Sequence, residues 1–457
     1  MLIPNNIGLT SNAPLHRQLV AYQTKFRRWW RDRGPSEFLE QPMPLRLPTG
    51  QTRGSGWATT KVMRPNDYVW GIFTVPRAHH QIVFGDAAGK PAWTTVPDEC
   101  RQILLEHVCV QADVENAAIE QSRTLTRSVP SGADLHNLFQ FFLEEGRHTW
   151  AMVHLLLEHF GSEGQVQAEA LLNRMSGDTE HPRLLGAFNV HTEDWLSHFM
   201  WCFLADRVGK YQIHAVTQSA FLPLAESARF MMLEEPLHIT FGLKGLERVL
   251  AHSVEVTRRR DRLDILEDNA IPLPVFQKYF NFWMSKIHDL FGNDDSSRSH
   301  DLYRLGIRAP RGMEGGEEEI EIDVRVGVDV ETHRVPAACA TNVIMRRQYE
   351  AEVGRIVGRW NDAIRLAGVD FTLTVPHERF AREHGACRQM PFDVDGVLLP
   401  ESEAHRLEAR VPSAEDREGV AALMNRELGD NRVAGWIAPP GTRLDHLCPS
   451  VAPGRLK

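Results

Sequence analysis

Two short stretches of this chain combine carboxylates and imidazoles at a spacing that suits metal binding. One is Glu144-Glu145-Gly146-Arg147-His148, and the other is Glu234-Glu235-Pro236-Leu237-His238. Each contains Glu-x-x-His, and residues three apart lie on the same face of an α-helix. Carboxylate and imidazole ligands suit iron or manganese. A single tetrapeptide of this kind means little. Two of them favour a di-metal site in which two further helices each add one carboxylate.

The carboxylate from the helix before the first motif can be chosen by its face. The candidates there are Asp113, Glu115 and Glu120. Glu115 shares a face with apolar residues such as Val108 and Ile119, whereas Glu120 shares its face with polar residues. A metal ligand must point into the core, so we predict Glu115.

Asp206 is the candidate from the helix between the two motifs. It continues an apolar stripe formed by Phe199, Cys202 and Phe203. A buried carboxylate without a partner is costly, and a pair of metal ions would compensate it. The predicted ligand set is therefore Glu115, Glu145, His148, Asp206, Glu235 and His238.

Two further glutamates, Glu144 and Glu234, stand one turn before the motif histidines. Each could accept the outer ring N–H of a ligand histidine, on its own helix or on the facing one. The alternative is that both are ordinary surface residues. The predicted apolar lining of a substrate pocket consists of Phe141, Phe142, Met152, Phe203 and Met231.

Long stretches of helical periodicity must position these residues. We predict four long helices and a long crossover, which is the pattern of a ferritin-like four-helix bundle. The first helix is expected at Asp98–Arg127, and the second runs from a cap at Ser131 or Asp134 to Phe160. The third runs from a cap at Thr192 to Ser219, and the fourth covers Leu222–Thr257. A short helix at Val166–Met175 connects the second and third helices.

The remaining sequence predicts extensions on both sides of this bundle. Residues 1–98 are expected to wrap the core as a helix, His16–Arg33, with short strands at Tyr68–Thr74 and Gln81–Phe84. Residues 99–290 would form the core. Residues 291–457 would carry a hairpin at 317–335, a helix at 338–366 and a strand at Asp370–Val375. The predicted fold is thus mainly α with short β elements.

Composition excludes several classes of protein. The 457 residues include 51 Lys and Arg against 60 Asp and Glu, a net charge of −9, whereas nucleic-acid binders usually have the opposite balance. The apolar runs end well before the roughly 18 residues of a membrane span. The first residues lack a secretory pattern. The six cysteines show no CxxC spacing. We expect a cytoplasmic protein without a nucleic-acid or membrane partner.

Several segments of the chain resemble the oxygenase component of benzoyl-CoA 2,3-epoxidase, from the aerobic benzoyl-CoA (box) pathway. The resemblance covers nearly the whole chain. Its segments are ADVEN (112–116), LFQFFLEEGRHTWAMVHLLLEHFG (138–161), FLADRVGKYQ (203–212) and MMLEEPLHITFG (231–242), together with VWGIF (69–73), PLPVFQKYFNF (272–282) and GWIAPP (435–440).

This resemblance implies a class I di-iron centre that uses O2 to epoxidise the ring of benzoyl-CoA. Electrons would come from NADPH through a separate reductase that carries FAD and iron–sulfur clusters. The family's iron ligands fall on the same six residues as the face argument, and a family glutamine falls on Gln111, near the site. The resemblance leaves open whether the chain is a monomer or a homodimer.

The fourth helix departs from the family pattern, which there is Glu-Glu-Ala-His-His. Pro236 and Leu237 differ, although His238 is kept. The substrate could therefore be another aryl-CoA, or a carrier-bound or free aromatic acid that is hydroxylated or N-oxygenated. A ferritin-like iron-binding protein without oxygenase activity is a further alternative.

Pro236 also affects the backbone, because proline lacks an N–H and crowds the preceding turn. We predict a kink or bulge between Met231 and Pro236. The alternative is that a new helix begins at Glu235, with Pro236 in its first turn, where proline is tolerated.

Overall fold

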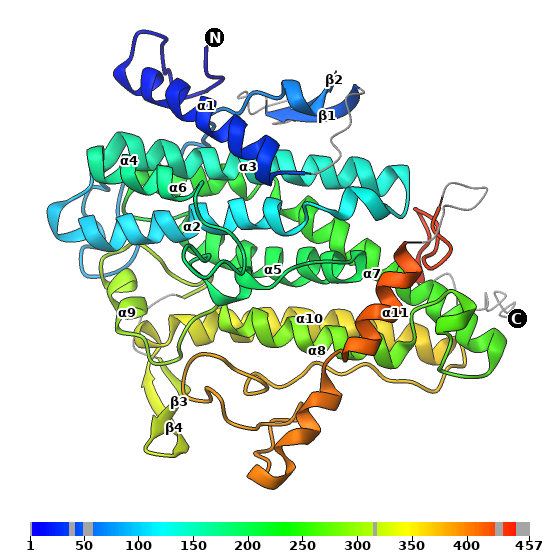
Figure 1. Ribbon diagram of the computed structural model, residues 1–457. Helices are drawn as coiled ribbons and strands as arrows, with labels where there is room; N and C mark the ends of the chain where they lie inside the picture. Colours follow the sequence, from blue (N-terminus) through cyan, green and yellow to red (C-terminus); the bar gives the residue numbers. More distant parts are fainter. Residues whose placement is uncertain (1, 36–41, 49–57, 314–317, 426–432, 445–457) are drawn as a thin grey trace, which may run out of the picture.

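The structure is a computed structural model that describes residues 2–35, 42–48, 58–313, 318–425 and 433–444. The fold is mainly α, as predicted, with a ferritin-like four-helix bundle and short β elements (Figure 1). Within the described residues, none of the helices combines the length and apolar character that a membrane span requires.

The bundle is built from two pairs of long helices. Helices α2 (Arg101–Gln121) and α3 (Gly132–His159) pack together, and α5 (Trp195–Val216) packs on α7 (Glu235–Arg260). The Ser131 hydroxyl accepts a hydrogen bond from the Asp134 backbone N–H, which confirms one of the two predicted caps of α3. The connecting helix α4 (Gly161–Ala170) begins and ends about one turn earlier than predicted.

The predicted cap of α5 is wrong by two residues. Asp194 caps this helix by accepting the backbone N–H of Ser197 at 2.7 Å. The Thr192 hydroxyl instead donates to the backbone carbonyl of Gln121 at 2.8 Å. Thr192 therefore ties the long crossover to the end of α2, and this role depends on a contact between distant residues.

The predicted fourth helix is divided in two. Helix α6 (Leu222–Met231) ends three residues before α7 begins, and Pro236 lies in the first turn of α7. Backbone N–H groups of Leu233 and Glu234 bond three residues back, to Phe230 and Met231, both at 2.9 Å. The alternative of a new helix is thus the correct one. It places Glu235 at a helix N-terminus, which favours a carboxylate.

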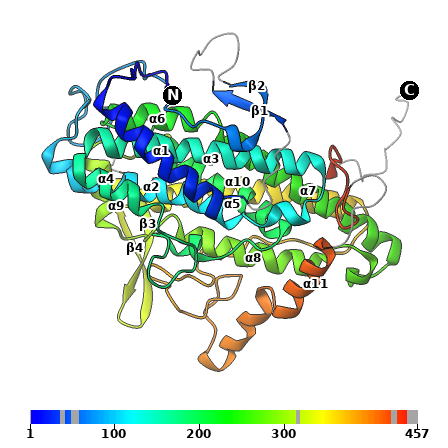
Figure 2. The ribbon, with the colours of Figure 1, turned by 45° about the horizontal axis from the view of Figure 1, so that its top comes forward.

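The N-terminal segment covers α3. Helix α1 (Pro14–Arg33) confirms the predicted helix and crosses α3 diagonally (Figure 2). Phe26 packs edge-on against Trp70 with ring centroids 4.7 Å apart. Strands β1 (Met43–Pro48) and β2 (Ala58–Met63) form an antiparallel pair. The predicted strands at Tyr68–Thr74 and Gln81–Phe84 are wrong, because these segments pack on helices and form only isolated bridges.

The C-terminal part contains helices and one hairpin around α5. Helices α8 (Leu273–Asp289) and α10 (Thr341–Leu366) pack against α5, and α9 (Ser297–Arg304) lies near the hairpin of β3 (Glu319–Val326) and β4 (Asp329–Pro336). Helix α11 (Ala414–Met424) follows. The hairpin and the α10 helix confirm the predictions. One continuous apolar core includes residues of all three predicted parts, so their boundaries remain a prediction.

The predicted strand at Asp370–Val375 is wrong. Side chains supply the hydrogen bonds that a neighbouring strand would provide. Asn361 bonds both the N–H and the carbonyl of Leu373, at 2.8 and 2.9 Å, and Gln277 does the same for Thr374. The segment therefore runs along α8 and α10 without a partner strand.

Gly242 allows the close approach of α7 to α5, and we expect Gly242→Ala to destabilise the fold. An added Cβ would overlap the Phe203 backbone nitrogen and lie 2.7 Å from the Cys202 carbonyl carbon. Overpacking of this kind costs about 1–3 kcal/mol. The control is Gly358→Ala on α10, which meets nothing within 4 Å and should gain about 0.5–1 kcal/mol. Denaturant unfolding measures both changes, and equal changes would contradict the close-packing argument.

Candidate metal centre

Six side chains from the four bundle helices converge in the core. Glu115, Glu145 and His148 place one potential ligand atom each within 4.8 Å of one another, and so do Glu145, Asp206 and His238. Glu145 belongs to both groups. The His148 Nδ1 lies 3.5 Å from Glu235 Oε1, which adds the sixth predicted residue to the same cluster.

Glu145 presents a different oxygen to each histidine. Its Oε1 lies 3.0 Å from His238 Nδ1, and its Oε2 lies 3.9 Å from His148 Nδ1. The Glu115 Oε2 lies 3.4 Å from the same His148 Nδ1. The carboxylate of Glu145 therefore stands between two imidazoles that face each other across the bundle. This is the placement of a ligand that bridges two metal ions.

Unsatisfied polar atoms in the cluster fit bound cations. His148 Nδ1, His238 Nδ1 and Asp206 Oδ2 are buried without a hydrogen-bond partner among the described residues. Buried polar atoms are normally paired. The His238 Nε2–H donates to Glu144 Oε2 at 3.0 Å, which leaves the inner Nδ1 lone pair free for a metal. The set of carboxylates and imidazoles could therefore hold two metal ions.

The carboxylates also require positive charge. Burial, and then the negative charge of Glu115, raises the pKa of Glu145 well above its ordinary value. Burial likewise raises the pKa of Asp206, and it raises that of Glu235 to about 7. Desolvation and like charges both disfavour the ionised form. Two divalent cations would reverse this balance and keep all four carboxylates ionised.

The two outer glutamates are exchanged between the motifs. Glu144, from the first motif, accepts from His238 of the second, and Glu234 Oε2 lies 3.1 Å from His148 Nε2 of the first. Both carboxylates are fully buried, so neither is a surface residue. Gln111 donates to Glu115 Oε1, which holds that carboxylate from one turn earlier on α2.

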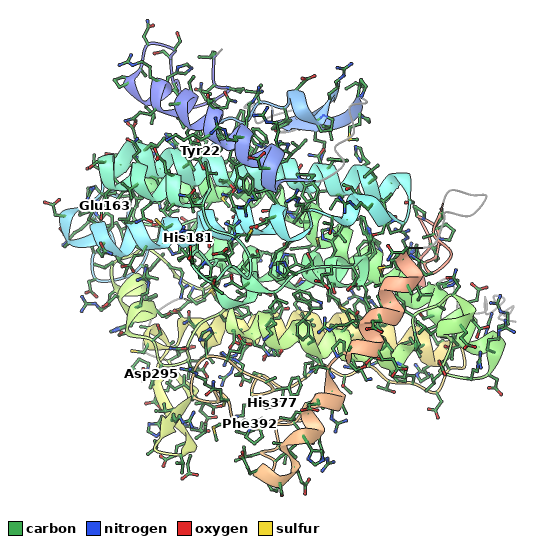
Figure 3. All side chains as sticks on the ribbon, in the orientation of Figure 1. Tyr22, Glu163, His181, Asp295, His377 and Phe392 are labelled. Carbon is green, nitrogen blue, oxygen red and sulfur yellow. The ribbon has the colours of Figure 1, made fainter. Side chains whose placement is uncertain are left out.

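A cavity of about 580 Å³ leads to the cluster, and Glu115, Glu145, Asp206 and Glu235 lie in its wall. It runs between α2, α5 and the segment from α8 to α9. Its surface end includes Glu163, labelled in Figure 3. The apolar wall includes Phe188 and Trp201, with ring centroids 4.8 Å apart.

The cavity wall differs from the pocket lining expected from the sequence. None of the five expected residues is among the described residues that line it. They are buried elsewhere, as where Phe203 packs on Trp360 at a centroid distance of 5.3 Å. The reason is that the open side of the cluster faces α2 and the start of α9. The five residues are Phe141, Phe142, Met152, Phe203 and Met231.

Comparison with known proteins shows the family of the chain. No family model matches the chain. A curated relative, benzoyl-CoA oxygenase component B of Aromatoleum evansii, is 38% identical over 458 residues, which cover 97% of this chain and 96% of the relative. The chain belongs to the benzoyl-CoA oxygenase component B family. The resemblance in the sequence is therefore confirmed, and the chain is an oxidoreductase of this family.

The cation that holds the two outer glutamates was not among the residues predicted from the sequence. Arg147 is buried, donates to Glu234 Oε1 at 2.6 Å, lies 3.4 Å from Glu144 Oε1, and also bonds the Tyr68 hydroxyl. Arg46 from β1 makes a second ion pair with Glu144. The position of Arg147 inside an apolar helix was the available signal. The sequence could not show which carboxylates it meets.

The contacts of the acidic residues on α2 sharpen the prediction for this helix. Asp113 and Glu120 point away from the cluster and pair with Arg183, Asp113 at 3.1 Å. We therefore expect Glu115→Gln to lose metal. Glu120→Gln should retain metal but lower the free energy of unfolding, because it removes one of the carboxylates paired with a buried guanidinium. Metal analysis together with denaturant unfolding tests both variants, and the reverse metal pattern would refute the assignment.

Proposed function

We propose that the chain is a di-iron monooxygenase that epoxidises the aromatic ring of benzoyl-CoA or a related aryl-CoA. The observation that carries this proposal is the carboxylate of Glu145 between two imidazoles, at the end of a cavity large enough for an aromatic ring. The name of the Aromatoleum evansii relative supplies benzoyl-CoA as the substrate.

The proposed iron ligands are Glu115, Glu145, His148, Asp206, Glu235 and His238. Four carboxylates would balance two ferrous ions, so the centre would be neutral in its reduced state. When bound, the iron pair would activate O2 so that one oxygen atom enters the ring and the other leaves as water. The proposed reaction requires no side chain as nucleophile or general base.

The residues around the centre would prepare it for this chemistry. Glu144 accepts the outer N–H of His238, and Glu234 faces that of His148, so both Nδ1 lone pairs would point at the metals. Gln111 holds Glu115 beside the cavity. Phe188 and Trp201 would exclude water and contact a flat aromatic ring.

The proposed reaction needs electrons from another protein. The relative is called component B, and this wording implies at least one further component. We propose a separate reductase that passes electrons from NADPH through FAD and iron–sulfur clusters. The described residues contain no cluster of cysteines that could bind an iron–sulfur centre.

The alternatives remain open to a direct comparison. An iron-binding protein without oxygenase activity would not need a cavity of about 580 Å³ that reaches the carboxylates. An oxygenase of a free aromatic acid or an aryl amine would use the same cavity, so the substrate must be tested.

We expect the reduced, iron-loaded protein to oxygenate benzoyl-CoA faster than benzoate or aminobenzoates. The experiment supplies each compound with labelled O2 and measures the mass of the products. One labelled oxygen atom per molecule of benzoyl-CoA product is the expected result. Equal rates for benzoate and benzoyl-CoA would favour the free-acid alternative. A rate of O2 consumption that is the same with and without each compound would favour the iron-binding protein.

A further inference from the structure

A buried arginine lies in the wall of the same cavity, away from the carboxylate cluster. Arg308 is only 9% exposed. Its Nη1 donates to Gln212 Oε1 at 3.0 Å, and its Nη2 donates to Ser299 Oγ at 3.0 Å and to Asn342 Oδ1. All three acceptors are neutral. A guanidinium has five N–H donors, so two remain, and the Nε is without a partner among the described residues.

The three acidic residues that the structure describes in the cavity wall outside the carboxylate cluster pair with other arginines. Glu106 pairs with Arg298, Glu163 pairs with Arg101 at 3.5 Å, and Asp289 pairs with Arg382 at 2.7 Å. Among the described residues, no carboxylate forms an ion pair with Arg308. A buried charge without a counter-charge is strongly unfavourable, and a guanidinium keeps its proton.

The other titratable groups on this wall do not supply the missing negative charge. Burial, and to a smaller extent the charge of Arg298, lowers the pKa of Arg308 to about 10, so Arg308 stays protonated at neutral pH. Burial, together with these two arginines, lowers the pKa of His107 to about 3, so His107 is neutral there. The net charge of this part of the wall is therefore positive.

The first turn of α9 adds further donors. Ser296 caps this helix, and Ser296, Arg298 and Ser299 all line the cavity. Asp295, labelled in Figure 3, is exposed in the loop that leads into α9. The first backbone N–H groups of a helix lack helical partners and attract anions. Arg308 and this helix start thus offer positive charge to the same space.

One face of α5 connects the proposed metal ligands with the surroundings of Arg308. Asp206, Gly209 and Gln212 follow one another three residues apart on α5 and all line the cavity. Gln212 therefore lies about 9 Å from Asp206 along the helix axis. Between them, Gly209 has no side chain, and an added Cβ would meet only Glu235 Oε2 at 3.7 Å. A path from the metal centre to Arg308 is kept open.

We propose that Arg308 and the first turn of α9 form an oxyanion-binding site within the substrate cavity. This proposal rests on the proposed function in one respect, that the cavity holds the substrate. The oxyanion is a group carried by the ligand, and two sources share this chemistry. One is a phosphate of an aryl-CoA, and the other is the carboxylate of a free aromatic acid.

Calorimetric titration of the full-length, iron-loaded protein distinguishes these sources. The probes are two pairs that differ in the oxyanion, 4′-phosphopantetheine against pantetheine and benzoate against benzamide. We expect the wild type to prefer the anion of one pair by about tenfold or more. A preference within the first pair would identify a phosphate as the bound oxyanion, and a preference within the second pair would identify a carboxylate. Arg308→Gln should abolish that preference. The control Arg304→Gln, at the last residue of α9 but exposed and paired with Asp86, should keep it.

The proposal is overturned if the wild type shows neither preference, or if a folded Arg308→Gln variant keeps the preference. If that variant does not fold, Arg308→Lys keeps the cation and should retain the preference within about threefold. Loss of the preference in a folded Arg308→Lys variant would also overturn it. Product analysis is independent, because a protein that prefers 4′-phosphopantetheine but oxygenates no aryl-CoA would keep the oxyanion site and lose the proposed function.

Discussion

Replacement of Glu145 by alanine is expected to remove metal from both halves of the centre. Glu145 is the residue that belongs to both ligand groups, with one oxygen toward each histidine. Loss of an outer-shell partner weakens metal binding by about 10- to 100-fold, and loss of a shared ligand should exceed this. The iron content measured after anaerobic loading should fall from close to two ions per chain to nearly none. Glu235→Ala should cause a similar loss.

The control for this experiment is Glu158→Ala, an exposed position on the same helix, which should keep full iron content. A second measurement separates a ligand from a structural residue. Burial and the charge of Glu115 disfavour an ionised Glu145 in the metal-free protein, so Glu145→Gln should leave the metal-free protein equally or more stable. Full iron retention in Glu145→Ala would refute the site. A less stable metal-free Glu145→Gln would point to a structural role.

Arg147→Met is expected to cause the largest loss of stability among single changes around the centre. The arginine is buried between Glu144 and Glu234. Burial lowers the pKa of Arg147, but these two carboxylates and Tyr68 together raise it by more, so its pKa lies above the ordinary value. Removal of one partner of a buried ion pair costs about 3–5 kcal/mol, because the remaining charges have no compensation. Denaturant unfolding of the metal-free protein measures the change directly.

Two comparisons identify the cause of that loss. Arg365→Met, at an exposed position on α10, should change stability by no more than about 0.5 kcal/mol. Adding Glu234→Gln to Arg147→Met removes one uncompensated carboxylate and should restore part of the stability. A loss below about 1 kcal/mol in Arg147→Met would mean that water or another cation satisfies both glutamates.

The sequence by itself determined most of the long helices and the β3–β4 hairpin, and it indicated the residue types of the candidate site. Helical periodicity, the Ser131 cap and the alternating residues of β3 and β4 depend on neighbours in the chain, so they could be predicted locally. The same holds for the choice of Glu115 over Glu120, because the face of a helix follows from its period of 3.6 residues. The two Glu-x-x-His motifs indicated metal ligands for the same reason.

The tertiary structure decided the partners of these residues. The sequence left open which histidine Glu144 and Glu234 would face, and the packing of α3 against α6 and α7 exchanged them between the motifs. It also placed Arg147 between the two glutamates. The contacts of Glu144 with His238, and of Arg147 and His148 with Glu234, join residues about 90 positions apart, and no local period encodes such a distance.

The cavity is the clearest case of a feature that only the tertiary structure decided. Local periodicity showed that residues such as Phe141 and Phe203 would be buried, but a buried side chain can face a packed neighbour or an open space. The approach of α9 and Arg308 to α2 and α5 decided where that space lies. Burial follows from the pattern of one helix, whereas the shape of a cavity follows from the fit of several helices, to which distant parts of the chain contribute.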